Sequence, residues 1–409
     1  MSSHVQERAA PAPLAIPNFR LLWIGQSLFS LAVQCYTVAF VWLVLQLTGS
    51  GLTLGTVMMV AAVPRAGAML VSGIIADRVQ PRWLLAGSAL GSALLVGAIG
   101  LLLRSNGLDL LALYLIAALL GLMDAFFYPT ALAQVPRLVD SSRLAPANAI
   151  ISTSDNVANI LGPALSGFVI STLGLPLTFA VNTLLFATGG LIMWRMRSPA
   201  QSEAGARPVE SWGTALRTGA RFAWHTPAIR MSLLMLAMLN FAAIGPVVVG
   251  LAVMAEQRFG GGASLYGVLS SSFGVGALVG GIAAGLLPTV KRPGLALVGL
   301  AFGMGAGLIG LGYAPWFWLA FLILALSGVG AGVVGVIATS WLQAQTPEHL
   351  QGRMASLLIF ALVAVDPFSN ALAGVLIDIS LAVLFSVAGV IMIATGLIAL
   401  ANAQVRNAS

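Results

Sequence analysis

Apolar stretches long enough to cross a membrane recur along the whole chain, and they limit its possible folds more than any other feature. A transmembrane α-helix needs about 20 predominantly apolar residues. Twelve such stretches lie approximately at 21–47, 52–76, 83–103, 110–134, 147–172, 175–194, 231–254, 265–287, 294–313, 316–342, 354–378 and 381–401. Because 59% of the 409 residues are hydrophobic and only 8% are charged, soluble globular and disordered chains are both excluded. The sequence predicts an all-α integral membrane protein with twelve transmembrane helices.

The positive charges indicate how these spans are oriented. If both termini are cytoplasmic, 16 of the 19 Lys and Arg residues fall in cytoplasmic segments, and only Arg104 and Arg258 fall in external loops. The positive-inside rule then predicts a multi-pass protein of the cell membrane with both termini in the cytoplasm. Residues 1–18 lack the apolar core of a signal peptide and are predicted to be a cytoplasmic tail. The net charge of +7 is thereby assigned to contact with anionic lipid headgroups, and no nucleic acid partner is expected.

Short motifs recur across the longest polar interruption, 198–230, which divides the spans into two sets of six. Asp155 and Asn159 in the fifth span match Asp366 and Asn370 in the eleventh at an offset of 211. Two further pairs recur at offsets of 211 and 212: 133–136 with 344–347, and Gly49 and Gly55 with Gly261 and Gly267. Such duplication predicts two pseudo-symmetric six-helix bundles, as in transporters whose substrate site lies between the repeats.

The predicted domain organisation follows from this division. It comprises an N-terminal tail (1–18), an N-terminal bundle (19–197), a central cytoplasmic loop (198–230), a C-terminal bundle (231–401) and a C-terminal tail (402–409). In the central loop, apolar residues from Val209 to Ala223 recur at helical spacing beside Arg217 and Arg221, which favours an interfacial helix. A solvated linker is the alternative, because Gly and Pro residues in this loop disfavour a helix.

Residues for ATP hydrolysis and for enzymatic catalysis are missing. The only lysine, Lys291, does not belong to a glycine-rich phosphate-binding loop. His4, His225 and His349 are scattered and Cys35 is the only cysteine, so a catalytic triad, a metal site and an internal disulfide all lack the residues they need. We therefore expect no enzyme, no cofactor and no metal, with the proton gradient as the energy source.

Four ionisable residues lie inside the predicted spans. Arg65 lies about halfway along the second span, Asp124 halfway along the fourth, Asp155 within the fifth and Asp366 halfway along the eleventh. Charged groups in hydrocarbon are strongly unfavourable unless they are paired or hydrated, so such residues are either packed ion pairs or functional sites. One arginine cannot neutralise three acids. The pattern predicts proton-coupling roles for the three acids together with Arg65.

Polar and aromatic side chains within the spans are candidates for a cavity wall. These are Gln34, Tyr36, Phe127, Asn159, Asn240 and Asn370. The alternative for the amides is to join helices by hydrogen bonds, and the alternative for the rings is to face lipid.

The connection between the second and third spans carries a family motif. Gly73-Ile-Ile-Ala-Asp77-Arg78-Val-Gln-Pro-Arg82 resembles the Gly-x-x-x-Asp-Arg-x-x-x-Arg loop of the major facilitator superfamily. Other stretches resemble the branch with macrolide and enterobactin exporters: 47–50, 64–65, 144–149, 162–163 and 351–353. The resemblance covers essentially the whole chain. It implies the major facilitator fold, a cavity lined by spans 1, 4, 7 and 10, and a monomeric drug:proton antiporter.

The resemblance also implies roles for individual residues. Asp77 would hold the cytoplasmic gate shut by contacting a neighbouring arginine and the start of the eleventh span, just beyond Gly352. In the fifth span, Gly162-Pro163-Ala-Leu-Ser-Gly167 resembles the antiporter signature Gly-Pro-x-x-Gly-Gly, with Ser166 in place of a glycine.

The same arrangement places Asp124 in the cavity wall. It also packs the second span beside the eleventh, so that Arg65 would reach Asp366 across the two bundles.

The sequence therefore predicts a proton-coupled secondary transporter that alternates between inward- and outward-open states. Its expected partners are protons, membrane lipids and an exported lipophilic or amphipathic small molecule of the drug, macrolide or siderophore class. Two alternatives stay open: an importer or facilitator of a small nutrient, and a nontransporting membrane sensor or scaffold.

Overall fold

The computed structural model describes residues 12–197, 221–286, 293–347 and 350–402, which are almost entirely helical. The N-terminal half contains α1 (Pro17–Thr48), α2 (Gly51–Arg78), α3 (Pro81–Arg104), α4 (Leu110–Leu138) and α5 (Leu144–Trp194), with short 3₁₀ turns at Pro13–Ala15 and Ser141–Arg143. The C-terminal half contains α7 (Pro227–Gly245), η3 (Pro246–Gly250), α8 (Leu251–Val253), η4 (Met254–Arg258), α9 (Gly262–Leu286), α10 (Pro293–Gly312), α11 (Phe317–Ala344), α12 (Gln351–Val363), α13 (Asp366–Ile379) and α14 (Leu381–Ala401). The all-α class is confirmed.

The described helices provide twelve candidate membrane spans. Eleven helical segments are long and apolar enough to span, and one of them, Ser141–Trp194, has 54 residues. A helix of that length would measure roughly 80 Å, far more than the bilayer core of about 30 Å. Gly174 divides it, because its φ of 78° and ψ of 168° lie in a region open essentially only to glycine. The fifth and sixth spans therefore meet at Gly174, as the sequence predicts.

Side-chain caps and glycine set several helix ends. Gly49 ends α1 in the left-handed conformation with φ 62°, and the Ser50 hydroxyl then accepts the Thr53 N–H to begin α2. Asp109 caps α4 in the same way by accepting the Ala112 N–H. Such caps satisfy main-chain donors that have no partner inside the helix.

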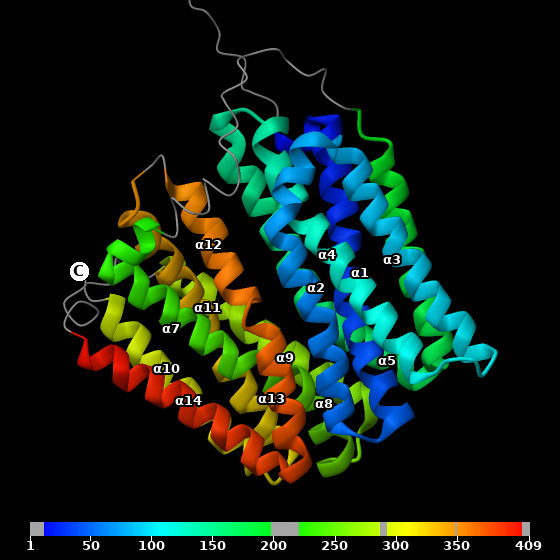
Figure 1. Cartoon of the computed structure of the whole chain (residues 1–409), viewed down its shortest axis with the longest axis vertical. Helices are drawn as coiled ribbons and strands as arrows, with labels where there is room; N and C mark the ends of the chain where they lie inside the picture. Colours follow the sequence, from blue (N-terminus) through cyan, green and yellow to red (C-terminus); the bar gives the residue numbers. More distant parts are fainter. Residues whose placement is uncertain (1–11, 198–220, 287–292, 348–349, 403–409) are drawn as a thin grey trace, which may run out of the picture.

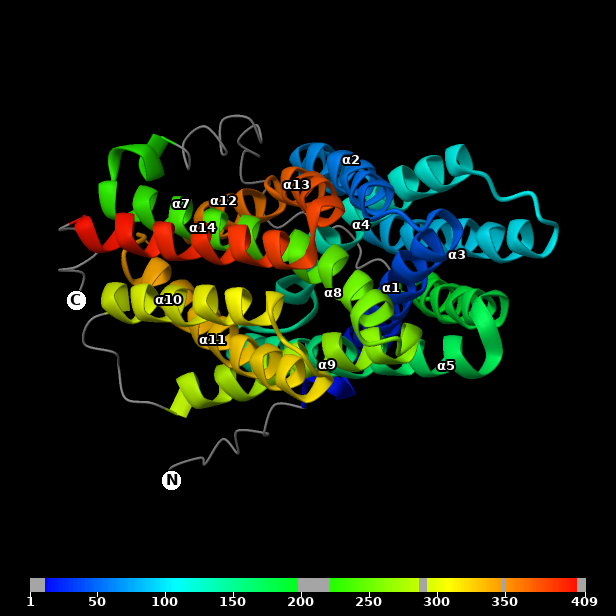
Figure 2. The ribbon, with the colours of Figure 1, turned by 90° about the horizontal axis from the view of Figure 1, so that it is seen from below.

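The helices form two six-span bundles, one from α1 to α5 and the other from α7 to α14 (Figure 1). The bundles lean apart toward the end where α5 finishes and α7 begins, and they converge at the opposite end. Seen from that converging end, α2 lies beside α13 and α5 beside α9 (Figure 2). The pairing of the second span with the eleventh agrees with the major facilitator arrangement.

Glycines permit the close contact between the bundles. A Cβ atom at Gly55 would lie 2.5 Å from the Cα of Gly374, and one at Gly267 would overlap the carbonyl oxygen of Pro163. Ser271 adds a polar contact, because its hydroxyl donates to the Ile160 carbonyl (2.6 Å) and accepts the Ala164 N–H (3.0 Å). Since small residues let helix backbones approach closely, both interbundle contacts depend on them.

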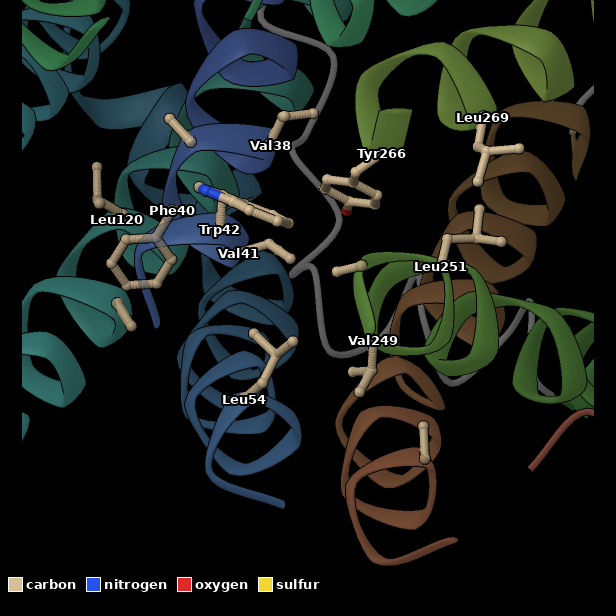
Figure 3. Packing of buried hydrophobic residues seen from close by; sticks show 14 of the residues in the cluster. Val38, Phe40, Val41, Trp42, Leu54, Leu120, Val249, Leu251, Tyr266 and Leu269 are labelled. Atoms are coloured by element: carbon tan, nitrogen blue, oxygen red, sulfur yellow. The ribbon is translucent and has the colours of Figure 1, made fainter. Parts of the chain in front are cut away.

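Buried apolar residues from both bundles continue the contact at the converging end. Trp42 and Leu54 from the N-terminal bundle lie opposite Val249 and Tyr266 from the C-terminal bundle (Figure 3). These four side chains are at most 3% exposed. The converging end is therefore closed by a packed apolar core.

Breaks in the helices are concentrated in the C-terminal bundle. The seventh span, Ile229–Arg258, includes two π-helical segments, η3 and η4. The eleventh span is divided between α12 and α13 at Ala364 and Val365. Such irregularities often mark functional sites.

The predicted interfacial helix of the central loop lies mostly outside the described residues. Residues 221–225 are helical, and Ala223 packs in a small buried cluster with Ile229, Leu233, Leu342 and Met354. The end of the central loop is thus anchored to the C-terminal bundle.

Candidate functional site

Asp155 in α5 is bound by two side chains of α1. The Ser30 hydroxyl donates to its Oδ1 (2.6 Å) and the Gln26 amide donates to its Oδ2 (3.3 Å). Trp23, one turn earlier in α1, donates its indole N–H to Ser154 at 2.8 Å. The fifth span is therefore attached to the first by a row of hydrogen bonds centred on a carboxyl group.

Asp124 in α4 belongs to the same side of the N-terminal bundle. Its charge acts on the hydroxyl groups of Tyr36 in α1 and Tyr128 in α4. Tyr128 also lies within electrostatic range of Asp155.

Asp366 is the corresponding acid of the C-terminal bundle. It is buried at the start of α13, and the Asn240 amide of α7 donates to its Oδ1 at 2.9 Å. The same amide donates to the Leu362 carbonyl at 3.0 Å. One turn further on, the Ser369 hydroxyl accepts the Gly245 N–H (2.9 Å) and donates to the Phe241 carbonyl.

The two bundles hold their acids in equivalent ways. Asp155 and Asp366 are 211 positions apart, and their partners Ser30 and Asn240 are 210 apart. In each bundle, a polar side chain of the first helix donates to a carboxyl group of the fifth. The sequence repeat therefore corresponds to a repeated hydrogen-bonded contact.

Arg65 in α2 acts on acids of both bundles. Its guanidinium lies within electrostatic range of the carboxyl groups of Asp124 in its own bundle and Asp366 in the other. Arg65 is half-buried, and within the described part of the chain it has no direct ion pair with either acid. Arg65, Asp124 and Asp366 thus form one electrostatically connected group across the bundle interface, whereas Asp155 is held separately by Ser30 and Gln26.

The antiporter-like motif of the fifth span contacts two different helices. A Cβ atom at Gly162 would lie 2.5 Å from the Cβ of Gln34 in α1, and one at Gly167 would lie 2.5 Å from the carbonyl oxygen of Ala263, just before Ser264 in α9. Ser166, which replaces the usual glycine, is buried and donates to the Cys35 carbonyl at 2.7 Å. The Ser166 hydroxyl therefore adds a hydrogen bond between the first and fifth spans. It does so in a motif where Pro163 has no main-chain N–H to donate.

Most of the predicted gate motif cannot be placed in contacts, because the surroundings of Gly73 and Gly352 and the side chains of Asp77 and Arg78 lie outside the described part of the chain. Arg82 is described: its Nε donates to Gln80 at 3.0 Å, and its guanidinium lies over the Trp83 ring at 5.0 Å. It therefore binds neighbours in its own segment.

The remaining cavity candidates are spread over different environments. Gln34 lies at the α1–α5 contact, and Tyr36 packs against Phe40. Phe127 is fully buried and stacked on Phe29 with ring centroids 3.4 Å apart. Asn159 is exposed, whereas Asn370 is buried with its main-chain carbonyl against Gly55.

Sequence reasoning did not single out Gln26, Ser30 or Ser369 as site residues. Each is a small or polar residue inside an apolar span, which is a weak signal because such residues commonly join helices. The sequence repeat gives a stronger signal for Ser30, since it lies one position away from the equivalent of Asn240. Because one residue is a serine and the other an asparagine, this correspondence is not visible as a repeated motif.

These features define a multi-pass membrane protein built from two related six-helix bundles, with ionisable groups at their interface. Residues 22–365 match the Major Facilitator Superfamily, and the chain belongs to that family.

Two curated relatives cover most of the chain. The multidrug efflux pump Tap of Mycolicibacterium fortuitum is 26% identical over 83% of this chain and 84% of its own. The enterobactin exporter EntS of Salmonella typhimurium is 30% identical over 75% of this chain and 72% of its own. These two proteins match the exporter branch that the sequence motifs indicate.

Solved structures share the fold at lower identity. A bacterial homologue of the iron transporter ferroportin, in an inward-facing state, has a TM-score of 0.70 and 16% identity over 94% of this chain and 99% of its own. The nucleoside transporter NupG has a TM-score of 0.69 and 12% identity over 95% of this chain and 98% of its own. The major facilitator fold is thereby confirmed.

Proposed function

We propose that this protein is a secondary transporter that exports a small lipophilic or amphipathic compound in exchange for protons. Alternating access would come from the two bundles rocking about their interface, with both termini in the cytoplasm. The similarity to Tap, a multidrug efflux pump, and EntS, an enterobactin exporter, supports export of a small molecule. The family resemblance of the gate and antiporter-like motifs supports the same direction.

The observation that carries the proposal is the electrostatic group at the interface. Arg65 attracts Asp124 and Asp366, which belong to different bundles. Charged groups in a membrane interior mark ion or substrate pathways because they are otherwise too unfavourable to keep. With three acids and one arginine, an added proton changes the attraction between the bundles, which is what coupling requires.

In this proposal each part of the site has a role. Asp124 is the main proton-binding residue in the cavity wall, and Asp366 carries a proton at the interface. Asp155 supports the N-terminal bundle. Asp77 holds the cytoplasmic gate closed in the outward-open state, and Gln34, Tyr36 and Asn159 contribute to substrate contact.

The test uses purified protein in liposomes with a trapped pH-sensitive dye. A growth-inhibition panel of macrolides, tetracyclines and siderophores first identifies a compound to which cells expressing the protein are resistant. Adding that compound should then drive proton flux across liposomes that contain the wild-type protein. Asp124→Asn should reduce the flux to the level of empty liposomes, and its elution in detergent should stay unchanged.

The matched control is Asp109→Asn in the same helix, because this carboxyl group caps the start of α4. It should retain most of the flux. Full proton flux in Asp124→Asn would contradict the proposed role of Asp124. Compound flux that is indifferent to the pH gradient would contradict proton coupling altogether.

A further inference from the structure

The main-chain hydrogen-bond ladder of the eleventh span is interrupted immediately before its acid, at Ala364 and Val365, although both residues keep right-handed helical dihedrals. Pro367 has no N–H, so the Val363 carbonyl receives no main-chain hydrogen bond from the residue four positions later. In an unbroken helix, the Leu362 carbonyl would accept the N–H of Asp366. Here it accepts the Asn240 amide of α7.

One amide group therefore spans the break. The Asn240 nitrogen lies 3.0 Å from the Leu362 carbonyl oxygen in α12 and 2.9 Å from Oδ1 of Asp366 in α13. An amide has two N–H donors, so each acceptor can receive one of them. An ionised carboxyl group only accepts hydrogen bonds, whereas a protonated one also donates, so a proton on Asp366 alters the contact that holds the two segments together.

The two sides of the break are held differently. After the break, α13 is fixed by the close contact of Gly374 with Gly55 and by the Ser369 hydroxyl, which accepts the N–H of Gly245 at the end of α7. Before the break, α12 extends toward the end at which the bundles lean apart (Figure 1). The break thus separates a fixed segment from one that leads to the open end.

The charges around Asp366 come from the other bundle. The helices packed against α13 are α2, α7, η3 and α14. Neither η3 nor α14 has a charged residue, and α7 has only Arg230, near its start. Within the eleventh span, Asp378 lies near the far end of α13, and the side chain of Arg353 near the start of α12 lies outside the described part. In α2, Arg65 attracts Asp366, and the side chains of Asp77 and Arg78 lie outside the described part.

We infer that Asn240 is a positioning residue that couples the charge on Asp366 to the angle of the eleventh span at Ala364 and Val365. Protonation of Asp366 rearranges the Asn240 contact and moves α12 relative to α13. The N-terminal bundle has no equivalent device, because Asp155 is bound within a helix that runs unbroken from Leu144 to Gly174. This inference rests on the proposed function, in which Asp366 carries a proton.

The experiment measures the distance between α12 and the N-terminal bundle as the pH changes. Spin labels are attached to cysteines at Ile359 in α12 and Leu132 in α4, both exposed, with Cys35→Ala removing the native cysteine. Distance distributions are recorded by pulsed electron resonance between pH 5 and 9 in liposomes. The wild-type chain should show a pH-driven change of distance, and Asn240→Leu should lose more than half of its amplitude.

Two variants separate a positioning role from a packing role. Asn240→Gln keeps both amide donors and should recover part of the response. Asn182→Leu is the matched control, because this buried amide donates only within its own helix, to the Thr178 carbonyl, and should leave the response unchanged. If Asn240→Leu does not fold, Asn240→Ser, with a single donor, should still show a reduced response.

The outcomes distinguish this inference from the proposed function. If Asp366→Asn keeps the wild-type response, Asp366 does not carry the relevant proton and the proposed function fails at this residue. If Asp366→Asn abolishes the response and Asn240→Leu or Asn240→Ser keeps it fully, only the positioning role of Asn240 is overturned. An equal loss in Asn182→Leu also overturns it.

Discussion

The N-terminal and C-terminal bundles hold equivalent acids in helices of different continuity. Asp155 accepts bonds from two side chains of α1 and lies in an unbroken helical turn. Asp366 accepts one amide, which also binds across a break in the eleventh span, and the neighbouring seventh span contains π-helical segments. The acid thus keeps its position in both halves of the repeat, whereas the helix around it is continuous in one half and interrupted in the other. We therefore expect more of the conformational change in the C-terminal bundle.

The largest effect on stability should come from the core of the N-terminal bundle. Phe127 is fully buried against Phe29, so Phe127→Ala should lower the free energy of unfolding by about 3–5 kcal/mol. The measurement is unfolding by sodium dodecyl sulfate in mixed micelles. Phe368→Ala in the other bundle is the control, since that ring is 69% exposed and its loss should change the value by less than about 0.5 kcal/mol. Similar losses in both variants would break the comparison.

Crowding the bundle interface should have the next largest effect. In Gly267→Ala, the new methyl group meets the main-chain carbonyl of Pro163, which cannot move aside without its helix. Overpacking of this kind destabilises by about 1–3 kcal/mol. Spin labels at Phe168 and Val268 should report a larger distance between α5 and α9.

The control for this interface lies in the same helix. A Cβ atom at Gly281 would meet nothing within 4 Å, so Gly281→Ala should leave both the stability and the label distance unchanged or stabilise the helix slightly. An increased distance in Gly281→Ala would mean that the interface responds to α9 as a whole and not to the contact at Pro163.

Replacing the two acids by amides should separate their roles. In Asp155→Asn, the new amide N–H faces one of the two side chains that donate to the carboxyl group in the wild-type protein, Gln26 or Ser30. The variant should therefore lose about 1–3 kcal/mol of stability. Asp366→Asn faces one donor and should lose less stability but remove the pH dependence of transport. Both quantities are measured on the same preparations. The reverse pattern would show that the N-terminal acid carries the proton.

The smallest effects should come from the two serines that bridge helix turns. Ser271→Ala and Ser369→Ala each remove one hydroxyl with two hydrogen bonds and should lower stability by about 0.5–1.5 kcal/mol. Ser271 joins the two bundles, whereas Ser369 acts within one. Only Ser271→Ala should therefore change the distance between bundles, and an equal change in Ser369→Ala would contradict the interface assignment.

Much of the fold could be predicted from the sequence because each membrane span requires a long apolar run. The sequence predicts twelve spans, their division into two sets and a boundary between spans near 172–175, since lipid requires each span to satisfy its own main-chain bonds. The four ionisable residues were found for a related reason: few charges are tolerated in a span.

The details of the site were less accessible. Ser30 and Gln26 differ from ordinary helix-packing residues only in what they contact, and those partners are more than 120 positions away. Phe127 illustrates the same difficulty, because this aromatic residue, three positions after Asp124 in the sequence, is fully buried against Phe29. Composition cannot tell which face of a uniformly apolar helix meets lipid, protein or cavity.

The junction at Gly174 limits how the N-terminal bundle can move. With a single non-helical residue between them, the fifth and sixth spans have almost no slack, so neither can slide along its axis without pulling the other. The two spans therefore move together, so that a tilt of the fifth span against α9 also moves the sixth span. Lengthening this bend by a few flexible residues would decouple the two arms while leaving every contact between the bundles in place.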